Sequence, residues 1–255
     1  MADPGFQGAV PPLADPVAEA ERILAAAHAA DVPLRVIGGV AVRLHTPDMP
    51  APLARTYGDI DMATPKGKGR PVAELLTDLG YEPARQFNAL QGETRLLFQD
   101  RGNDRKLDVF VGQFELNHAI PITRRIDVEP VTIPLAELLL TKLQVVEYTD
   151  KDMRDTIALL LDHEVSDHDG DAINGDVVAA LTAEDWGLWR TTEINLERIR
   201  TGLRDVGLDP ADEQIVRERV DAVWQRIEGR EKSRRWRLRA KVGERKRWYA
   251  VPDEV

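Results

Sequence analysis

Two aspartates, Asp59 and Asp61, stand two residues apart inside an apolar stretch, YGDIDMAT. Carboxylates are rarely buried unless they are paired or bind a metal ion. The stretch is typical of a β-strand, in which residues i and i+2 point to the same face. We therefore expect Asp59 and Asp61 to share one face of a sheet while Ile60 and Met62 pack on the other. The use of these two carboxylates is the central question of this sequence.

The first 130 residues or so alternate between helix and strand signals, which predicts an α+β fold with a small mixed sheet flanked by helices. A helix is expected over 15–32, where Asp15 can cap and Pro16 takes the first helical position. A buried strand, PLRVIGG, should lead directly into a helix, GVAVRLHT. Two later strands, TRLLFQ and KLDVFVG, are separated by DRGNDR, which favours a hairpin turn.

From Pro134 onward the strand signals stop, and the second half of the chain reads as helical. Two helices are expected around Thr149–Asp150, and two long ones over 175–206 and 209–242. The acidic segment 167–176 lacks the glycine and the closing glutamate of a calcium loop, so it is interpreted as a solvated loop. We predict a flexible N-terminus (1–15), a core (16–133), and an all-helical C-terminal domain (134–255) ending in a basic tail (230–248).

Composition and charge restrict the class of protein. No apolar run approaches the length of a membrane span, the N-terminus lacks the features of a secretory signal, and there are no cysteines, which fits a cytoplasmic protein without a membrane partner. The net charge is −10, but residues 230–255 hold ten basic and four acidic residues. The remainder of the chain is therefore strongly acidic, so only the tail suits nucleic acid.

A third carboxylate, Asp108, has the same setting as the first two, between Leu107 and Val109 on a predicted strand. If that strand neighbours the first, three carboxylates converge, and such hard oxygen ligands suit Mg²⁺. Two Mg²⁺ ions can then bracket an in-line displacement at phosphorus. The alternative is that Asp-x-Asp pairs in an acidic chain are merely solvated.

Gly38 and Gly39 follow a predicted buried strand and open a helix. The backbone N–H groups at such a position can hold a phosphate. The alternative is a tight strand-to-helix turn with no ligand.

These motifs, VIGGVAVRLH, ARTYGDIDMAT and KLDVFV, resemble in their order and spacing those of the DNA polymerase β-like nucleotidyltransferase superfamily. Within that superfamily, the motifs most resemble those of the AbiEii-type minimal nucleotidyltransferases, which include toxins of toxin–antitoxin systems. The helical stretch LAELLLTKLQVV…DKDMRDTIALLL resembles the region that follows there. One departure is that Tyr57 and Gly58 replace the Thr and Lys often found before the Asp-x-Asp pair.

The resemblance implies that a nucleoside monophosphate moves from an NTP to an acceptor hydroxyl, with Mg²⁺ held by Asp59, Asp61 and Asp108. It implies nucleotide contacts by Gly38 and Gly39, and a catalytic role for Lys142. It further implies nucleotide-binding roles for three residues: Arg55, Asp152 and Asp155. Read without the resemblance, Lys142 is a lysine extending from a solvated helix face, and Asp152 and Asp155 are acids favoured near a helix N-terminus.

The acceptor and the partners stay open. An RNA such as tRNA suits the basic tail, a cationic small molecule suits the acidic body, and a protein hydroxyl is a further acceptor. If the chain is a toxin, an antitoxin protein would be its partner.

The tail also carries Trp236 and Trp248, which could stack on bases, while its alternative role is to pack against the acidic body. The alternative function is a non-catalytic nucleotide-binding or nucleic-acid-binding module.

Overall fold

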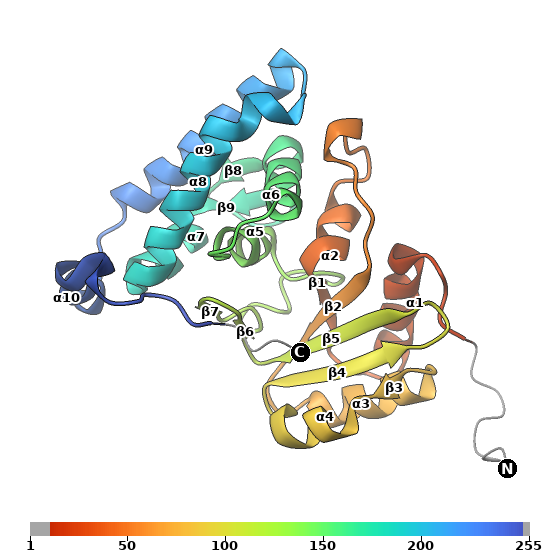
Figure 1. The fold of residues 1–255 in the computed structure, drawn as a ribbon. Coiled ribbons are helices and arrows are strands. Elements are labelled where there is room, and N and C mark those ends of the chain that lie inside the picture. The colour runs from red at the N-terminus through yellow and green to blue at the C-terminus, as the bar shows by residue number, and fades with distance from the viewer. Residues whose placement is uncertain (1–10, 252–255) are drawn as a thin grey trace, which may run out of the picture. The chain divides into compact units, whose positions relative to one another are not determined.

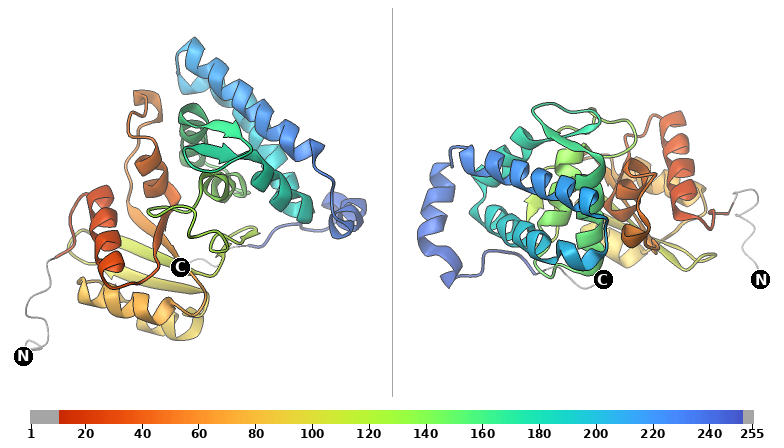
Figure 2. Two further views of the ribbon diagram at one scale, coloured as in Figure 1. Left: turned by 180° about the vertical axis from the view of Figure 1, so that it is seen from behind. Right: turned by 90° about the horizontal axis from the view of Figure 1, so that it is seen from above.

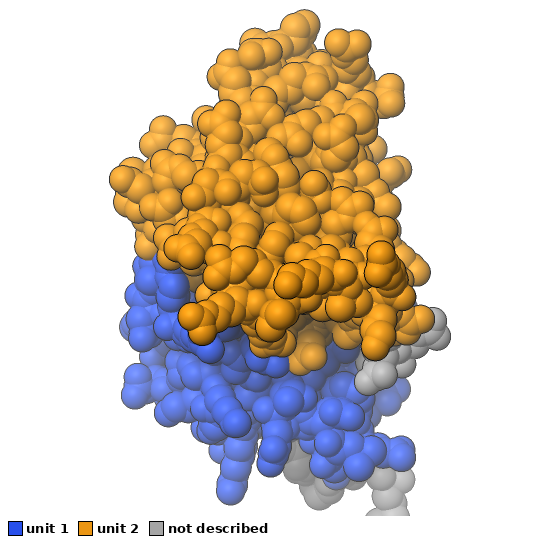
Figure 3. Space-filling view, turned by 90° about the vertical axis from the view of Figure 1, so that its left-hand side faces the viewer, with its two compact units in different colours: residues 1–41, 56–113, 121–133 blue, residues 42–55, 114–120, 134–255 orange. Residues whose placement is uncertain are grey.

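The computed structural model describes residues 11–251, so most of the predicted flexible N-terminus lies outside the described residues. The chain divides into two compact units, which Figure 3 shows in blue and orange. Unit 1 comprises residues 1–41, 56–113 and 121–133, and unit 2 comprises residues 42–55, 114–120 and 134–255. The expected α+β class is confirmed, because unit 1 contains a mixed sheet with helices and most of unit 2 is helical.

Unit 1 is built on a five-stranded sheet with the order β1-β2-β5-β4-β3 (Figure 1). Its strands are β1 (Arg35–Ile37), β2 (Asp59–Thr64), β3 (Glu82–Pro83), β4 (Arg95–Asp100) and β5 (Arg105–Val111). β2 runs parallel to β5 and antiparallel to β1, and the expected β4–β5 hairpin is present. The predicted strands are therefore confirmed, and β3 is an addition that the sequence did not indicate.

Three helices accompany this sheet: α1 (Pro16–Ala29), α3 (Gly69–Asp78) and α4 (Arg85–Gln91). Figures 1 and 2 show α3 and α4 running along one side of the sheet. That side is the apolar core, because Val72 and Leu76 of α3 are fully buried together with Ile60 and Met62 of β2. α1 begins as predicted, since the carboxylate of Asp15 accepts hydrogen bonds from two N–H groups of its first turn.

A buried polar contact ties α1 to the end of α3. The Tyr81 hydroxyl donates to Glu19 over 2.8 Å, and the guanidinium of Arg22 donates to the same carboxylate at two distances of 2.7 Å. Burial raises the pKa of Tyr81, so the phenol stays protonated and remains a donor. Glu19 is fully buried and is therefore paired, as a buried carboxylate has to be.

Unit 2 consists mainly of helices, and the expected pair around Thr149 is confirmed. The helices after Pro134 are α5 (Leu135–Leu143), α6 (Asp150–Asp162), α7 (Gly175–Glu184), α8 (Trp186–Val206), α9 (Pro210–Gly229) and α10 (Arg234–Val242). The two long helices expected from the sequence are each divided in two. Asp185 caps α8 and Ser233 caps α10 by accepting hydrogen bonds from backbone N–H groups. The second helix of each pair therefore begins with an N-cap of its own.

The prediction of an all-helical C-terminal domain is wrong in one place. Two short strands, β8 (Glu164–Ser166) and β9 (Ala172–Asn174), form a parallel pair around the segment interpreted as a solvated loop. Ile173 is fully buried, so only the residues between the strands are a loop. Three residues are too few to show a strand periodicity, which is why the sequence gave no signal. None of the described helices is long and apolar enough to cross a membrane.

The predicted domain boundary also needs a correction, because residues 42–55 and 114–120 group with unit 2 rather than with the predicted core. The first segment contains the end of α2 (Gly38–His45) and a short 3-10 helix (Ala51–Leu53). The ring of His45 lies edge-on to that of His163, with 5.6 Å between centroids. The second segment contains β6 (Phe114–Glu115) and β7 (Ala119–Ile120), and Asn117 accepts a hydrogen bond from the backbone of Val146 over 2.8 Å.

Candidate active site

The three predicted carboxylates lie on one face of two neighbouring strands in unit 1. In the parallel β2–β5 ladder, Asp61 pairs directly with Asp108, and Asp59 lies two residues before Asp61. Paired residues and residues at i and i+2 share a face, so all three side chains belong to the same face. Ile60 and Met62 point to the other face and are fully buried, as expected from the sequence.

The carboxylates remain accessible because their face of the sheet is not the helix-covered one. Asp59 is exposed, and Asp61 and Asp108 are half-buried. Alternation along β2 therefore puts apolar residues into the core and acids onto the open face. Asp59 is therefore hydrated, while the more buried Asp108 is paired with a cation, as a buried carboxylate has to be.

Arg95 on β4 is a site residue that the sequence interpretation missed. Its Nε donates to Oδ1 of Asp108 over 2.7 Å, and only 24% and 13% of the two side chains are exposed. Its guanidinium also lies 5.3 Å from the ring centroid of Phe110. A signal for it was present, because the β4–β5 hairpin pairs Leu97 with Asp108 and so brings Arg95 to the same face.

Gly38 has a structural reason to be glycine. α2 begins at this residue, directly after β1, and its φ is +69°, a conformation that favours glycine. A Cβ at this position would stand 2.3 Å from Oδ2 of Asp61. The predicted start of a helix at the two glycines is confirmed, and the first turn of α2, including Gly39, presents N–H groups that have no partner inside the helix.

Replacing Gly38 by alanine tests this close approach. We expect Gly38→Ala to destabilise the protein by about 1–3 kcal/mol and to displace the Asp61 carboxylate, because both the positive φ and the contact oppose a Cβ. Gly67→Ala is the matched control, since Gly67 also has a positive φ (+81°) but nothing within 4 Å of its Cβ position. Thermal unfolding and Mg²⁺-dependent nucleotide binding would separate the two effects. Equal loss of binding in both variants would contradict the proposed contact.

The carboxylates fit Mg²⁺ in donor type and in backbone register. Within residues 11–251, however, no three His, Cys, Asp or Glu side chains are grouped so that they could hold one metal ion as they stand. One oxygen of Asp108 is engaged by Arg95. A cation held by all three carboxylates would therefore require side-chain rotations, and one that uses Oδ1 of Asp108 would have to displace Arg95.

Unit 2 contains a second charged cluster, made of Arg55, Lys142 and Asp155. Both oxygens of Asp155 accept from the guanidinium of Arg55 at 2.7 Å, and Oδ2 also lies 2.8 Å from Nζ of Lys142. Asp155 is 1% exposed, and the side chains of Arg55 and Lys142 are 14% and 11% exposed. The alternative interpretation of Lys142 as a residue on a solvated helix face is therefore wrong, and three of the predicted site residues lie together here.

Asp152 is not part of this cluster. Its carboxylate accepts hydrogen bonds from the backbone N–H and the hydroxyl of Thr149, and the Thr149 hydroxyl accepts from the backbone of Asp152, which completes a capping box. Asp152 and Asp155 therefore differ in role although they are three residues apart. The structure places Asp152 as a helix cap rather than with the cationic residues.

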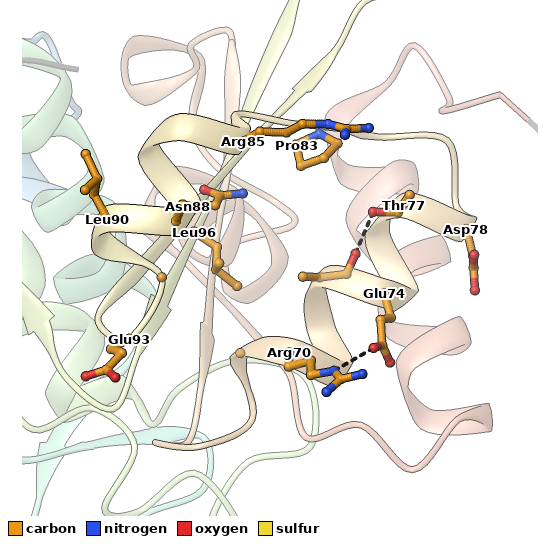
Figure 4. A pocket seen from close by; sticks show the side chains of 14 residues that line it. Arg70, Glu74, Thr77, Asp78, Pro83, Arg85, Asn88, Leu90, Glu93 and Leu96 are labelled. Atoms are coloured by element: carbon orange, nitrogen blue, oxygen red, sulfur yellow. Dashed lines mark hydrogen bonds and ion pairs between the residues drawn. The ribbon is translucent and has the colours of Figure 1, made fainter. Parts of the chain in front are cut away.

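A large cavity of unit 1, about 960 Å³, lies elsewhere. Figure 4 shows it between α3, which contributes Arg70 and Glu74, and α4, which contributes Asn88 and Leu90. Leu96 of β4 also lines it, and Leu96 alternates with Leu97, the residue that pairs with Asp108. The cavity therefore borders the opposite face of the sheet from the carboxylates and is not their substrate pocket.

Comparison with known proteins leaves the family open. No protein-family model matches the chain, and no curated protein matches it. The resemblance to the AbiEii-type subgroup is therefore not supported by the family models. A solved structure described as ANT(2″)-Ia in complex with adenylyl-2″-tobramycin is similar at 19% sequence identity and a TM-score of 0.37, over 56% of this chain and 86% of that chain.

Proposed function

We propose that the chain is an enzyme that transfers a nucleoside monophosphate from an NTP to an acceptor hydroxyl. The observation that supports this most is the pairing of Asp61 with Asp108 on adjacent parallel strands, with Asp59 on the same face. Carboxylates fixed on rigid strands and open to one side are what a Mg²⁺–triphosphate complex needs. Gly38 and Gly39, at the start of α2, would each supply a backbone N–H for the phosphates, and Gly38 lies beside Asp61.

The proposed reaction is an in-line displacement at the α-phosphorus. Asp108 accepts the proton of the acceptor hydroxyl, and the acceptor oxygen forms a bond to the α-phosphorus. The bond between the α-phosphorus and the bridging oxygen to the β-phosphate breaks, and pyrophosphate leaves with that oxygen. Mg²⁺, when bound by the carboxylates, would neutralise the charge on the phosphate oxygens. Arg95 holds Asp108 in place through its ion pair before the substrate binds.

In unit 2 we assign Asp155 a positioning role. Its buried carboxylate orients the guanidinium of Arg55 and the ammonium of Lys142. A guanidinium and an ammonium that are held side by side suit an anionic group such as a phosphate. Asp152 does not share this role, because its carboxylate completes the capping box at the start of α6.

A label-transfer assay tests the proposed function. Purified protein is incubated with each of the four NTPs, labelled at the α-phosphate, with Mg²⁺ or with a chelator, and with total RNA, with cationic small molecules, or alone. We expect label to move to one acceptor class and pyrophosphate to appear only with Mg²⁺. Mg²⁺-dependent NTP binding without pyrophosphate in any tube would favour the alternative, a nucleotide-binding module. NTP binding that is equal in chelator would contradict the metal site.

A further inference from the structure

All five tryptophans of the chain belong to one aromatic cluster in unit 2. Ring centroids are separated by 6.4 Å for Trp186 and Trp189, 5.9 Å for Trp189 and Trp224, 5.2 Å for Trp189 and Trp236, and 6.2 Å for Trp186 and Trp248. The residues come from α8, α9, α10 and the segment that follows α10. The cluster therefore attaches the basic tail to the helices by aromatic packing.

The segment after α10 is also fixed by polar contacts. The indole N–H of Trp248 donates to the hydroxyl of Thr191 over 3.1 Å, and the backbone N–H of Ala250 donates to the carbonyl of Asn117 over 2.9 Å. The Trp248 carbonyl approaches Gly187 so closely that a Cβ there would lie 2.4 Å away. These contacts hold the tail in a defined position on unit 2.

The positive charge of this surface is not neutralised by the acidic body. The ion pairs that involve the tail are Arg237 with Glu231, within the tail, and Arg190 with Glu244, where the tail supplies the acid. Seven basic side chains in the described part of the tail are exposed and form no ion pair: Arg230, Arg234, Arg235, Lys241, Arg245, Lys246 and Arg247. The tail therefore packs against the helices of unit 2, as the alternative interpretation expected, but it does so through its tryptophans and leaves these seven charges exposed.

An aromatic pocket of about 390 Å³ opens beside these charges. Its lining includes Trp186, Trp236, Trp248 and Tyr249, and Arg235, Arg239 and Arg247. Arg239 is used structurally, because it lies 4.7 Å from the ring centroid of Trp186 and donates to the carbonyl of Gly243 over 2.6 Å. Arg235 and Arg247 are exposed, and the guanidinium of Arg247 lies 5.8 Å from the ring centroid of Tyr249. Among the described residues, none accepts a hydrogen bond from the buried indole N–H of Trp236.

We propose that this surface, the tail and its aromatic pocket, binds single-stranded RNA. Exposed arginines and lysines bind the phosphates of the RNA backbone, and an unpaired base can stack on the aromatic side chains that line the pocket. A duplex has no unpaired base to offer. Tyr249 is half-buried in the wall, where its ring packs edge-to-face with Trp248 and carries the guanidinium of Arg247. A base that stacks on Tyr249 takes the place of this guanidinium, which can then bind the phosphate of the same nucleotide. The exposed carboxylate of Glu184 at the pocket can accept a hydrogen bond from a 2′-hydroxyl, which favours RNA over DNA. The strongly acidic remainder of the chain repels RNA elsewhere.

Equilibrium binding of a short, unstructured, fluorescently labelled RNA tests the proposal without any nucleotide or catalytic step, so its outcome is independent of the proposed transferase function. We expect Arg235→Gln/Arg247→Gln to weaken binding about tenfold and to lower the slope of log affinity against log salt by about 1.4, since two phosphate contacts are lost. The control Lys151→Gln/Arg204→Gln removes two exposed charges elsewhere in unit 2 and should leave affinity nearly unchanged.

The aromatic part has its own pair of variants. Tyr249→Leu should weaken binding by about 5- to 100-fold, whereas Tyr249→Phe keeps the ring and should retain most of the affinity. Thermal unfolding of every variant confirms that unit 2 is intact. Equal losses in the tail and control doubles, equal losses in the two Tyr249 variants, or tighter binding of duplex RNA or single-stranded DNA than of single-stranded RNA would each overturn the proposal.

Discussion

Asp61→Asn is expected to lower the rate of nucleotidyl transfer by about 10³-fold, with little change in stability. The substitution keeps the shape of the side chain but removes the negative charge that lies opposite Asp108 in the β2–β5 ladder. Asp61 is half-buried on the open face of the sheet, so the core residues Ile60 and Met62 are not disturbed. The measurements are the initial rate of pyrophosphate release and the thermal unfolding curve.

The matched control is Asp104→Asn, the same chemical change in the turn between β4 and β5. Asp104 is exposed and has φ = +49°, a conformation that asparagine also tolerates. We expect this variant to keep both activity and stability. Retained transfer in Asp61→Asn, or an equal loss in Asp104→Asn, would contradict the assignment of the carboxylates. Titration with Mg²⁺ adds a second readout, because NTP binding by Asp61→Asn should lose its dependence on the ion.

Asp155→Asn is expected to destabilise the protein by about 3–5 kcal/mol, because it removes the buried negative charge that Arg55 and Lys142 share. In a chain of this size that corresponds to a fall of roughly 6–20 °C in the melting temperature of the affected unit. The measurement is thermal or urea unfolding followed by circular dichroism. Asp150→Asn, in the exposed first turn of the same helix, should cost much less.

A double variant distinguishes charge burial from a simple loss of packing. Adding Lys142→Met to Asp155→Asn removes one of the two cations that contacted the Asp155 carboxylate and should recover part of the lost stability. Adding Lys151→Met, at an exposed position, should recover none. If both additions behave alike, the loss in Asp155→Asn does not arise from uncompensated charge, and the positioning role of Asp155 is wrong.

Much of the local structure could be predicted from the sequence because its causes are local. Asp15 and Thr149 cap the helices that follow them, and the alternation of acids with Ile60 and Met62 predicts the two faces of β2. The strand-to-helix turn at Gly38 was also predicted, although the reason for the glycine, its approach to Asp61, depends on pairing of β1 with β2. Arg95 could have been found, since hairpin pairing follows from the turn.

The helix breaks and the domain boundary were less predictable. Asp185 and Ser233 are good caps, but a polar residue inside a helical pattern is also common on a solvated face. Residues 42–55 join unit 2 because Arg55 pairs with a residue 100 positions away, which no local pattern reports.

The sequence by itself therefore determined the longer strands of the sheet in unit 1, most of the helices, the open acidic face of β2, and the concentration of basic residues near the C-terminus. Only the tertiary structure decided which of these meet. It placed Asp61 opposite Asp108 and separated Asp152 from Asp155. It also gathered the five tryptophans into one cluster that attaches the basic tail to unit 2. The physical reason is that propensity, capping and alternation act within a few residues, whereas strand partners and buried ion pairs are selected by packing between distant segments.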